Sequence, residues 1–265
     1  MIPKVIHYCW FGGNDLPELA LRCIESWKKY CPDYEIKEWN ESNFDVNCCD
    51  YVREAYESKK WAFVSDYARF KILYENGGLY FDTDVELIRP LDDIIARGGF
   101  MGIENEPSSV NPGLGLAVAP GLELYSDLLE AYHDRHFIRE DGSLNLKTVV
   151  EYTTEILEKK GLKSQNEIQY VAGVYIYPKE YFCPMDYETG DLKVTEKTYS
   201  IHHFNASWHS KSEKYAVELQ RRFRRFMPRK MAVVLSLIIA KIKYDGVVLF
   251  IKYAYKKIKK RLFEK

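Results

Sequence analysis

The pattern of apolar and polar positions is clearest between Trp61 and Asp84. Apolar side chains recur there first with the spacing of one helix face, at Phe63, Tyr67, Phe70 and Tyr74. Gly77 and Gly78 follow, and glycine suits the left-handed cap at which many helices end. The unbroken apolar run 79–81 then predicts a strand that is buried on both faces. The stretch therefore predicts a helix, a glycine stop and a strand that ends at acidic residues.

The rest of the chain alternates between strand and helix patterns. Strands are expected at 4–10, 34–39, 85–90, 100–103 and 115–119, and helices at 17–30, 51–58, 122–133 and 146–160. The segments 175–178 and 181–184 are interpreted as an aromatic and proline-rich loop. A first strand followed by a glycine turn and a helix is typical of nucleotide-binding α/β folds.

Two pairs of charged residues flank the predicted helix-to-strand turn. In an extended chain Asp82 and Asp84 project to the same side and Thr83 to the other. Two such carboxylates can hold a hard divalent cation against a phosphate, although Asp-Thr-Asp also suits a solvated turn. Asp66 and Arg69 lie three residues apart on the helix, where the alternative is a surface ion pair of ~0.3–0.5 kcal/mol.

The combined pattern resembles a known enzyme family. The order S-D-x-x-R, then L-Y-x-x-G-G-x-Y-x-D-x-D, is similar to the glycosyltransferases with a DXD sugar-binding region. That group includes yeast-type initiating mannosyltransferases, bacterial capsular polysaccharide transferases and the glucosylating domain of large clostridial toxins. The matching positions are Ser65, Asp66, Arg69, Leu73, Tyr74, Gly77, Gly78, Tyr80, Asp82 and Asp84. The resemblance implies a GT-A-type α/β fold, a single nucleotide-binding domain whose mixed, mostly parallel central sheet is flanked by helices.

The resemblance also implies a metal ion, Mn²⁺ or Mg²⁺. Asp84 is expected to coordinate it directly, and Asp82 to contribute both to the metal and to the donor. The late segment Tyr199–Trp208 resembles the family's His-His-x-x-x-Ser-Trp element, which closes over the donor diphosphate. By that match His203 is the expected third ligand, since imidazole is an acceptable ligand for a cation already held by carboxylates. His202, which points the other way on a strand, is expected to have a structural role.

Further donor contacts are implied by the same resemblance. Trp10 is expected to stack on the uracil of the donor, and Asp66 and Arg69 to hold hydroxyls of the donor sugar. Without the resemblance, Trp10 would more readily be assigned to the core, and Asn-Pro-Gly at 111–113 is also an ordinary turn. The complete set of expected donor-binding residues is Trp10, Asp66, Arg69, Asp82, Asn111, Ser207 and Trp208. Tyr152-Thr153-Thr154 stands where many relatives carry Thr-Gly-Pro, so sugar or acceptor contacts there stay open.

Length and cysteine usage limit the protein class. A chain of 265 residues suits one α/β domain with a small appendage. Its six cysteines lack the spacing of zinc ligands, and no N-terminal signal segment precedes the first strand. We therefore expect reduced cysteines and a cytoplasmic location.

Charge divides the chain into a body, 1–210, and a tail, 211–265. The tail has 17 Lys or Arg against 4 Asp or Glu, a net +13, which leaves −14 for the body, since the total is −1. The ten apolar residues 231–240 are half of what a spanning helix needs. The tail is predicted to be a basic amphipathic helical segment that lies on an anionic membrane surface, with a solvated helix pair on the body as the alternative. No recognised nucleic-acid-binding module is present.

Together these features predict a metal-dependent glycosyltransferase that retains the donor's anomeric configuration. The expected donor is a nucleotide sugar, with UDP favoured and a guanine nucleotide left open. The expected acceptor is a capsular or cell-surface polysaccharide or a lipid-linked oligosaccharide, and the expected location is the cytoplasmic face of the membrane. No residue stands out as a covalent nucleophile. The alternatives are a toxin-like protein glycosyltransferase, an inactive carbohydrate-binding protein, and a nucleotidyltransferase, although the turn 11–15 lacks the basic residue of the last class.

Overall fold

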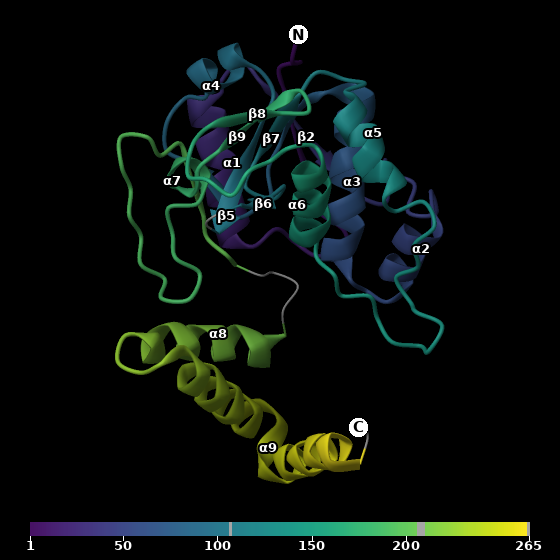
Figure 1. Cartoon of the computed structure of the whole chain (residues 1–265), viewed down its shortest axis with the longest axis vertical. Helices are drawn as coiled ribbons and strands as arrows, with labels where there is room; N and C mark the ends of the chain where they lie inside the picture. Colours follow the sequence, from purple (N-terminus) through teal and green to yellow (C-terminus); the bar gives the residue numbers. More distant parts are fainter. Residues whose placement is uncertain (106–107, 206–209, 264–265) are drawn as a thin grey trace. The chain divides into compact units, whose positions relative to one another are not determined.

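The structure is a computed structural model that describes residues 1–105, 108–205 and 210–263 (Figure 1). It divides into two compact units. The first comprises Met1–Pro184 and Lys193–His203, and the second comprises Met185–Leu192 and Phe204–Lys265. The second unit thus contains the basic tail together with a short segment that precedes it in the sequence.

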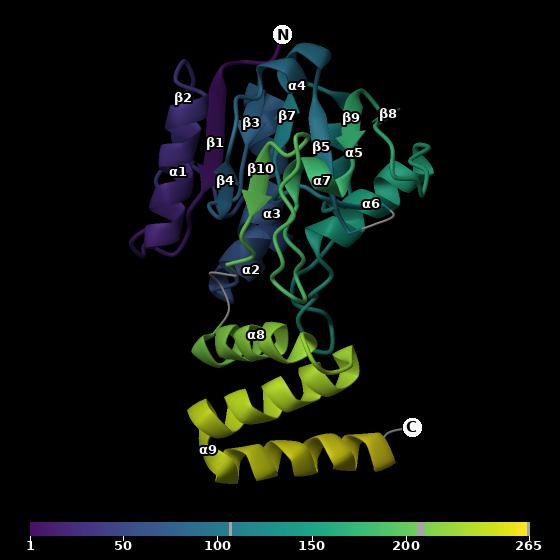
Figure 2. The same ribbon diagram turned by 90° about the vertical axis from the view of Figure 1, so that its left-hand side faces the viewer.

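A mixed sheet forms the centre of the first unit. In the part of the chain that the structure describes, eight strands form this sheet in the order β2-β1-β3-β7-β5-β9-β8, with β6 paired to β5 (Figure 2). β2, β1, β3, β5 and β9 run in one direction, and β7, β8 and β6 run against them. A separate antiparallel ladder joins β10 to β4. The strands are β1 Val5–Cys9, β2 Glu35–Trp39, β3 Gly78–Tyr80, β4 Val85–Leu87, β5 Phe100–Asn105, β6 Ser109–Asn111, β7 Leu116–Val118, β8 Gln169–Val171, β9 Val174–Tyr177 and β10 Ser200–His202.

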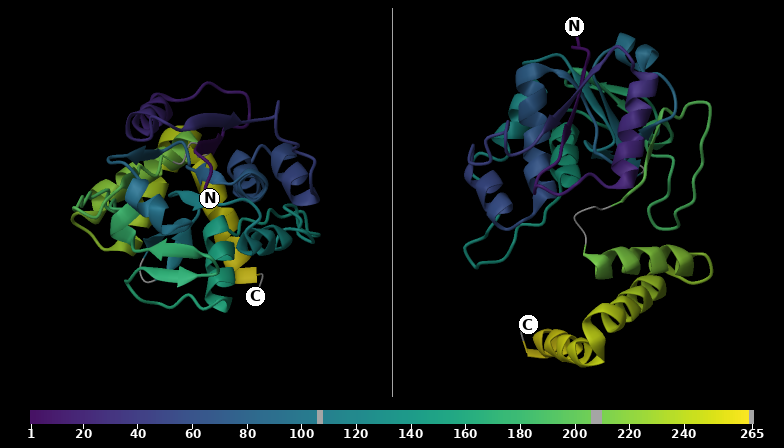
Figure 3. Two further views of the ribbon diagram at one scale, coloured as in Figure 1. Left: turned by 90° about the horizontal axis from the view of Figure 1, so that it is seen from above. Right: turned by 180° about the vertical axis from the view of Figure 1, so that it is seen from behind.

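Helices cover both faces of this sheet. α1 lies on one face, and α3, α5 and α6 lie on the other (Figures 1 and 3). The helices of this unit are α1 Glu18–Tyr30, α2 Asp50–Glu57, α3 Trp61–Asn76, α4 Asp92–Arg97, α5 Glu123–Glu130, α6 Val149–Lys159 and α7 Lys179–Phe182. The expected fold class, a mixed and mostly parallel sheet flanked by helices, is confirmed.

α3 is buried more completely than its sequence pattern predicts. Besides the expected apolar face, Val64, Ala68 and Ile72 are buried. The cause is its position, since α3 packs against β1 and β7 of the sheet and also against α2 and α5. A helix that is covered on several sides needs apolar residues around most of its circumference. The polar residues it does carry are therefore confined, and two of them belong to the site described below.

The turn from α3 to β3 depends on glycine. Gly77 and Gly78 have φ of 65° and 97°, a region that other residues rarely adopt. Behind this turn lies His7 of β1, whose ring nitrogen Nε2 is 3.0 Å from the Gly77 carbonyl oxygen. The indole N–H of Trp39 donates to Nδ1 of the same ring at 3.0 Å, so His7 is neutral with its proton on Nε2. The predicted glycine stop is confirmed.

The segment 174–184, which was expected to be a loop, has regular structure. Val174 and Ile176 are fully buried in β9, which pairs with β5 and β8. α7 follows, and its Phe182 ring stacks on Phe100 with 4.8 Å between ring centroids. The prolines misled the sequence interpretation, because Pro178 starts α7 as its N-cap residue rather than breaking a strand.

The second unit contains two helices, α8 Lys211–Arg224 and α9 Arg229–Phe263. Ser210 begins α8 with a capping box to Glu213, and Gly246, at φ 80°, divides α9 into two helical halves. α8 and α9 pack on each other, and small residues such as Ala216 of α8 and Ala232 and Ala240 of α9 are buried in this unit. None of the described helices has an apolar stretch long enough to cross a membrane.

Candidate functional site

A buried guanidinium organises the polar residues between α3 and β3. Arg69 is only 3% exposed, and its Nη2 lies 2.9 Å from Oδ1 of Asp66 and 3.2 Å from Oδ1 of Asp82. Its Nε donates to the Ser65 carbonyl at 3.1 Å, and its plane lies over the Tyr80 ring at 4.9 Å. The alternative of a solvated surface ion pair between Asp66 and Arg69 is therefore wrong. The helix places these side chains on its face toward the carboxyl end of β3.

Two carboxylates share this single cation. Burial raises the pKa of Asp66 to about 7; the positive charge of Arg69 opposes this rise, and the negative charge of Asp82 adds to it. Burial alone would lower the pKa of Arg69, but Asp82 and then Tyr80 and Asp66 raise it, so the guanidinium stays charged. The Tyr80 hydroxyl donates to Oδ1 of Asp82 at 3.0 Å. The cluster keeps an excess of hydrogen-bond acceptors, which suits a ligand rich in hydroxyl groups.

The two aspartates do not extend from a strand as the sequence analysis assumed. β3 ends at Tyr80, and the Val85 N–H donates to the Asp82 carbonyl at 3.0 Å, so residues 82–85 form a turn. Asp82 faces Arg69, whereas Asp84 faces the β10–β4 ladder. The prediction that Asp82 and Asp84 project to the same side of an extended strand is therefore wrong. The turn nevertheless places both carboxylates beyond the carboxyl end of β3.

The His202 side chain meets the carboxylate of Asp84, whereas His203 contacts Asp84 through its backbone, where its N–H donates to the Asp84 carbonyl at 3.0 Å. Nε2 of His202 lies 3.2 Å from Oδ1 of Asp84, and Nε2 of His203 lies 2.8 Å from Oε2 of Glu86. Burial opposes the charged form of His202, but the carboxylate of Asp84 raises the pKa of its imidazole well above the usual value. β10 pairs with β4 with His202 opposite Val85, which places His202 next to Asp84, and the structural role expected of His202 stays a prediction. The metal-binding role expected of His203 stays a prediction.

The donor atoms at this point fit a hard divalent cation. Asp82 and Asp84 supply carboxylate oxygens, and their side chains are 29% and 17% exposed. His202 supplies an imidazole whose Nε2 lies 3.2 Å from Asp84. Among the described residues, however, no three His, Cys, Asp or Glu side chains converge tightly enough to form a complete site. A cation bound here would therefore need further oxygen donors from the molecule that binds together with it.

Asn111 lies close to the aspartates through Gly113. The Asn111 amide donates to Glu104 at 2.9 Å, and its oxygen accepts from the Gly113 N–H at 2.6 Å. The Gly113 carbonyl in turn accepts from the Asp82 N–H at 3.2 Å. A Cβ at Gly113 would lie 2.1 Å from Oδ2 of Asp82. The predicted position of Asn111 near the site is supported, and its contact with a donor stays a prediction.

The remaining expected residues are placed as follows. Trp10 follows β1 and is half-buried, and its indole N–H donates to the Asn14 carbonyl at 2.6 Å. It is thus not part of the buried core, and a face for stacking on a base stays a prediction. Ser207 and Trp208 lie outside the described residues.

Comparison with known proteins identifies the central part of the chain. Residues 17–101 match the family described as "Glycosyltransferase sugar-binding region containing DXD motif". Over these residues the chain is similar to the DXD glycosyltransferase family. The match covers α1, α2, α3 and the turn that carries Asp82 and Asp84, so the resemblance expected from the sequence is confirmed.

Individual relatives are similar to parts of this chain. Inositol phosphoceramide mannosyltransferase 3 of Schizosaccharomyces pombe is 36% identical over 98 residues, which are 36% of this chain and 27% of that protein. Inositol phosphoceramide mannosyltransferase 1 of the same organism is 26% identical over 151 residues, which are 52% of this chain and 46% of that protein. This chain thus matches less than half the length of these relatives. Among solved structures, the PaToxG glycosyltransferase is 18% identical with a TM-score of 0.45, covering 60% of this chain and 70% of that one.

Three residues that contact the aspartates, Tyr80, Gly113 and His202, were not assigned to the DXD site from the sequence. Tyr80 and Asp82 are two apart, so their shared side of the strand end could have been read from the spacing. The close approach of Gly113 and the pairing of β10 with β4 had no such local signal. His202 and Gly113 were therefore found only through contacts between segments that are distant in the sequence.

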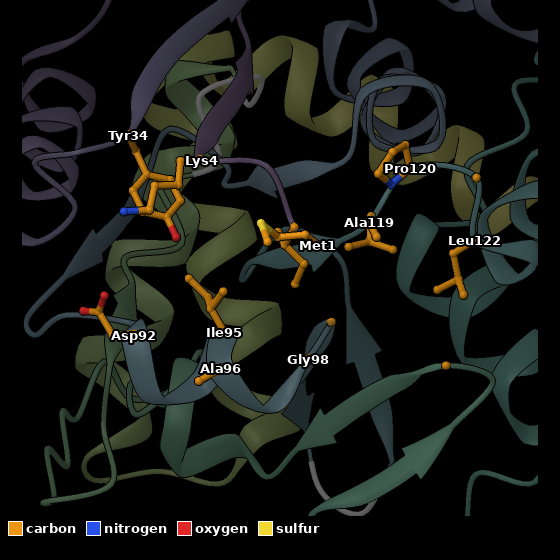
Figure 4. A pocket seen from close by; sticks show the side chains of 15 residues that line it. Met1, Lys4, Tyr34, Asp92, Ile95, Ala96, Gly98, Ala119, Pro120 and Leu122 are labelled. Atoms are coloured by element: carbon orange, nitrogen blue, oxygen red, sulfur yellow. The ribbon is translucent and has the colours of Figure 1, made fainter.

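A cavity of about 770 Å³ lies elsewhere, at the amino ends of β1 and β5 (Figure 4). Its lining is largely apolar, with Met1, Ile95, Ala119 and Leu122 around it, and Lys4 and Asp92 supply charge. None of the DXD site residues lines it. The DXD turn is at the opposite edge of the sheet, since it follows the carboxyl end of β3.

Proposed function

We propose that this protein is a metal-dependent glycosyltransferase that uses a nucleotide-sugar donor. The observation that carries the proposal is the buried Arg69 with Asp66 and Asp82 on either side of it, next to Asp84 at the carboxyl end of β3. Ligands of open α/β sheets bind beyond the carboxyl ends of strands. The match of residues 17–101 to the DXD glycosyltransferase family supports the same class of reaction.

The donor sugar would be bound by the carboxylates around Arg69. Asp66 and Asp82 can accept hydrogen bonds from sugar hydroxyls, while Arg69 holds both carboxylates in place and donates. A hydroxyl that pairs with a buried, already oriented carboxylate gives strong discrimination between sugars, because its loss leaves the carboxylate unpaired. Tyr80 would fix the position of Asp82.

The diphosphate would lie near Asp84. Asp84 and Asp82 would hold Mn²⁺ or Mg²⁺, with His202 favoured by its contact with Asp84 and His203 by its place in the family pattern. Such a cation, when bound, neutralises the charge that develops on a departing diphosphate. Asp84 raises the pKa of His202, so where His203 and not His202 binds the cation, the His202 imidazolium would add to this neutralisation.

We further propose that transfer retains the anomeric configuration by a front-face route. The leaving phosphate would take the proton of the attacking acceptor hydroxyl, and the new C–O bond would form on the face from which the diphosphate departs. The lack of a dedicated nucleophile among the site residues supports this route. The anomeric configuration of the product, measured by NMR, tests it, and an inverted product would overturn it.

The base and the sugar are proposed from Trp10 and from the names of two relatives. Half-buried Trp10, at the end of β1, favours stacking on uracil, hence a UDP-sugar. Two relatives are named mannosyltransferases, so mannose is included among the donor sugars to be tested and guanine among the bases. Their names also specify a lipid, inositol phosphoceramide, as the acceptor. This supports a lipid-linked oligosaccharide, or a cell-surface or capsular glycan, as the acceptor here.

The tail would hold the enzyme at an anionic membrane surface on the cytoplasmic side. Met231, Val234, Leu235, Ile238 and Ile242 recur at helical spacing on one side of α9, and all but half-buried Ile238 are exposed. Ala232, Ser236 and Ala240, at i, i+4 and i+8 on the other side, are buried. An apolar stripe within a segment of net charge +13 is typical of helices that lie in an interface.

The experiment that tests the activity measures nucleotide release from a panel of UDP- and GDP-sugars with Mn²⁺. Asp84→Ala should reduce release from the preferred donor by roughly 10²–10³-fold. Asp33→Asn, which removes the charge of an exposed carboxylate paired with Lys4, is the matched control and should leave release unchanged. Release that Asp84→Ala does not affect would contradict the proposal.

Two outcomes separate the alternatives. Donor binding by calorimetry without turnover on any acceptor would favour an inactive carbohydrate-binding protein. Transfer to a protein acceptor, and not to glycans or lipids, would favour the toxin-like class. Absence of both donor binding and turnover across the panel would overturn the glycosyltransferase proposal.

A further inference from the structure

Glu104 of β5 carries a carboxylate to which no role has been given so far. The side chain is half-buried, and its Oε2 accepts a hydrogen bond from the Asn111 amide at 2.9 Å. Glu104 forms no ion pair with any residue that the structure describes. A half-buried carboxylate without a cation needs hydrogen-bond donors, and one amide N–H satisfies only part of this need. The carboxylate therefore keeps lone pairs for donors that a ligand would bring.

Glu104 is also the extra residue of a β-bulge between β5 and β6. The residues on either side of it pair with Val110 and Ser109, so Glu104 itself has no partner in the ladder. A bulge changes the direction in which a side chain points, and bulges are frequent beside active sites. The hydrogen bond from Asn111 then fixes where the carboxylate lies.

The Asn111 amide connects Glu104 to the aspartates of the DXD turn. Its nitrogen contacts Glu104, and its Oδ1 accepts from the Gly113 N–H at 2.6 Å. From the position that a Cβ of Gly113 would occupy, Oδ2 of Asp82 is 2.1 Å away and Oδ1 of Asn111 is 3.0 Å away. The Asp82 carboxylate and the Asn111 amide therefore border the same small space, and Glu104 is the next polar group along this edge.

The order of the strands places Glu104 beyond the donor site. β1, β3 and β5 run in one direction, with β7 between β3 and β5, so their carboxyl ends lie at one edge of the sheet (Figure 2). Trp10 follows β1, Asp82 follows β3, and Glu104 is the penultimate residue of β5. With the base at the first of these positions and the donor sugar at the second, as proposed above, the third position is left for the acceptor.

We propose that Glu104 binds the acceptor by accepting a hydrogen bond from a hydroxyl next to the one that attacks. This inference rests on the proposed function, and it narrows the acceptor at this position to an uncharged sugar or polyol. A carboxylate near Asp82 and Asp84 repels a phosphate group, whereas a sugar supplies the hydroxyl donors that its lone pairs need. Glu104 takes no proton during transfer, since the leaving phosphate accepts it.

Acceptor kinetics test this role, with the methyl glycosides of glucose, galactose and mannose as probe acceptors. Glu104→Ala should raise the acceptor KM by about tenfold or more, which is the effect of losing a hydrogen bond to a charged group. Its kcat should stay within about threefold of the native value, because the lost contact is made equally before and during transfer. Hydrolysis of the donor without acceptor should be unchanged, which also shows that the variant is folded.

Two further variants control for structural effects. Glu104→Gln keeps an oxygen that can accept the hydroxyl, so it should raise the acceptor KM less than Glu104→Ala does. Asn105→Ala changes the exposed neighbour in β5 and should leave the acceptor KM, kcat and donor hydrolysis unchanged. An unchanged acceptor KM in Glu104→Ala would overturn the proposal. An equal loss of acceptor-free hydrolysis would overturn it as well, because Glu104 would then act on the donor through Asn111.

Ligand-observed NMR separates failure of this inference from failure of the proposed function. Saturation transfer from the protein to a methyl glycoside, with UDP and Mn²⁺ present, requires binding but no turnover. A signal that is lost in Glu104→Ala and kept in Asn105→Ala would support the acceptor site even where no donor is turned over. Absence of saturation transfer from a native protein that hydrolyses its donor would overturn the acceptor site and leave the proposed function in place.

Discussion

At the scale of single residues, the site depends on which side chain meets which carboxylate. Arg69 is held by Asp66 and Asp82, and His202 is held by Asp84. His203, one residue later, meets Glu86 instead. β10 ends at His202, and the side chains of the two histidines contact different carboxylates.

This separation can be tested with matched substitutions. If His202 acts beside Asp84, His202→Asn should reduce nucleotide release by roughly 10–100-fold, as loss of a group that supports metal ligands does. His203→Asn should then have an effect of less than about twofold on release at saturating Mn²⁺. The measurement is Mn²⁺ titration of nucleotide release for both variants. The reverse order of effects would instead support His203 as the ligand expected from the family pattern.

His7 predicts a pH dependence of stability. Its neutral ring donates to Gly77 and accepts from Trp39, and burial lowers its pKa to about 4 from 6.5. Between these values the unfolded chain binds more protons than the folded one, so the free energy of unfolding falls as pH drops from 6.5 to about 4. The slope from this group is at most about 1.4 kcal/mol per pH unit.

Urea unfolding at pH 7 and pH 5 measures this contribution. His7→Gln keeps a donor and an acceptor but cannot become charged, so its loss of stability between the two pH values should be smaller than that of the native protein. An identical loss in both proteins would show that other groups cause the pH dependence.

At the scale of elements, the site is made where separate segments approach closely. The turn 111–115 passes beside Asp82, and Gly113 leaves room for the carboxylate. Gly113 is not among the glycines with positive φ, and a Cβ there would meet Oδ2 of Asp82 at 2.1 Å and Oδ1 of Asn111 at 3.0 Å. The requirement is therefore one of space rather than of backbone conformation.

Gly113→Ala should accordingly displace Asp82 while the fold persists. We expect donor affinity, measured by calorimetry, to fall by about tenfold or more, which corresponds to about 1.4 kcal/mol or more of lost binding free energy. The melting temperature should change little. Ser109→Ala, in the neighbouring β6, is the control for which both quantities should stay near those of the native protein. Normal donor affinity in Gly113→Ala would show that Asp82 does not contact the donor.

At the scale of the whole molecule, charge is divided between an acidic body and a basic tail. The residues up to 210 carry −14 and those after them +13. An anionic bilayer would attract the tail and repel the body, and this favours binding through α9. The apolar stripe would add the part of the affinity that salt does not weaken.

Sedimentation with vesicles containing phosphatidylserine tests this division. Val234→Glu combined with Ile242→Glu should weaken vesicle binding by at least about tenfold, because burial of each apolar side chain contributes about 1.5–3 kcal/mol. Ser212→Glu combined with Gln220→Glu adds the same charge on α8 and should have a much smaller effect. Equal losses from both pairs would mean that charge alone binds the tail, and unchanged binding in both would exclude the α9 stripe.

The sequence by itself determined the elements and the family. Helical spacing in 61–76, the glycines at 77 and 78 and the apolar run that follows are local features, and each forms the element that its pattern predicts. Asp66, Arg69 and Asp82 were also found in this way, because they lie within a single helix–turn–strand segment. Local patterns suffice where the neighbours in space are neighbours in sequence.

Only the tertiary structure decided what surrounds these residues. The burial of Arg69, the turn at 82–85, the contact of Gly113 with Asp82 and the choice of His202 over His203 at Asp84 arise from pairing between distant segments. β9 was missed for the same reason, since its pairing with β5 and β8 reveals it, whereas the prolines that follow it in the sequence suggested a loop. Strand register and burial depend on the whole sheet, so they cannot be read from any one stretch of the chain.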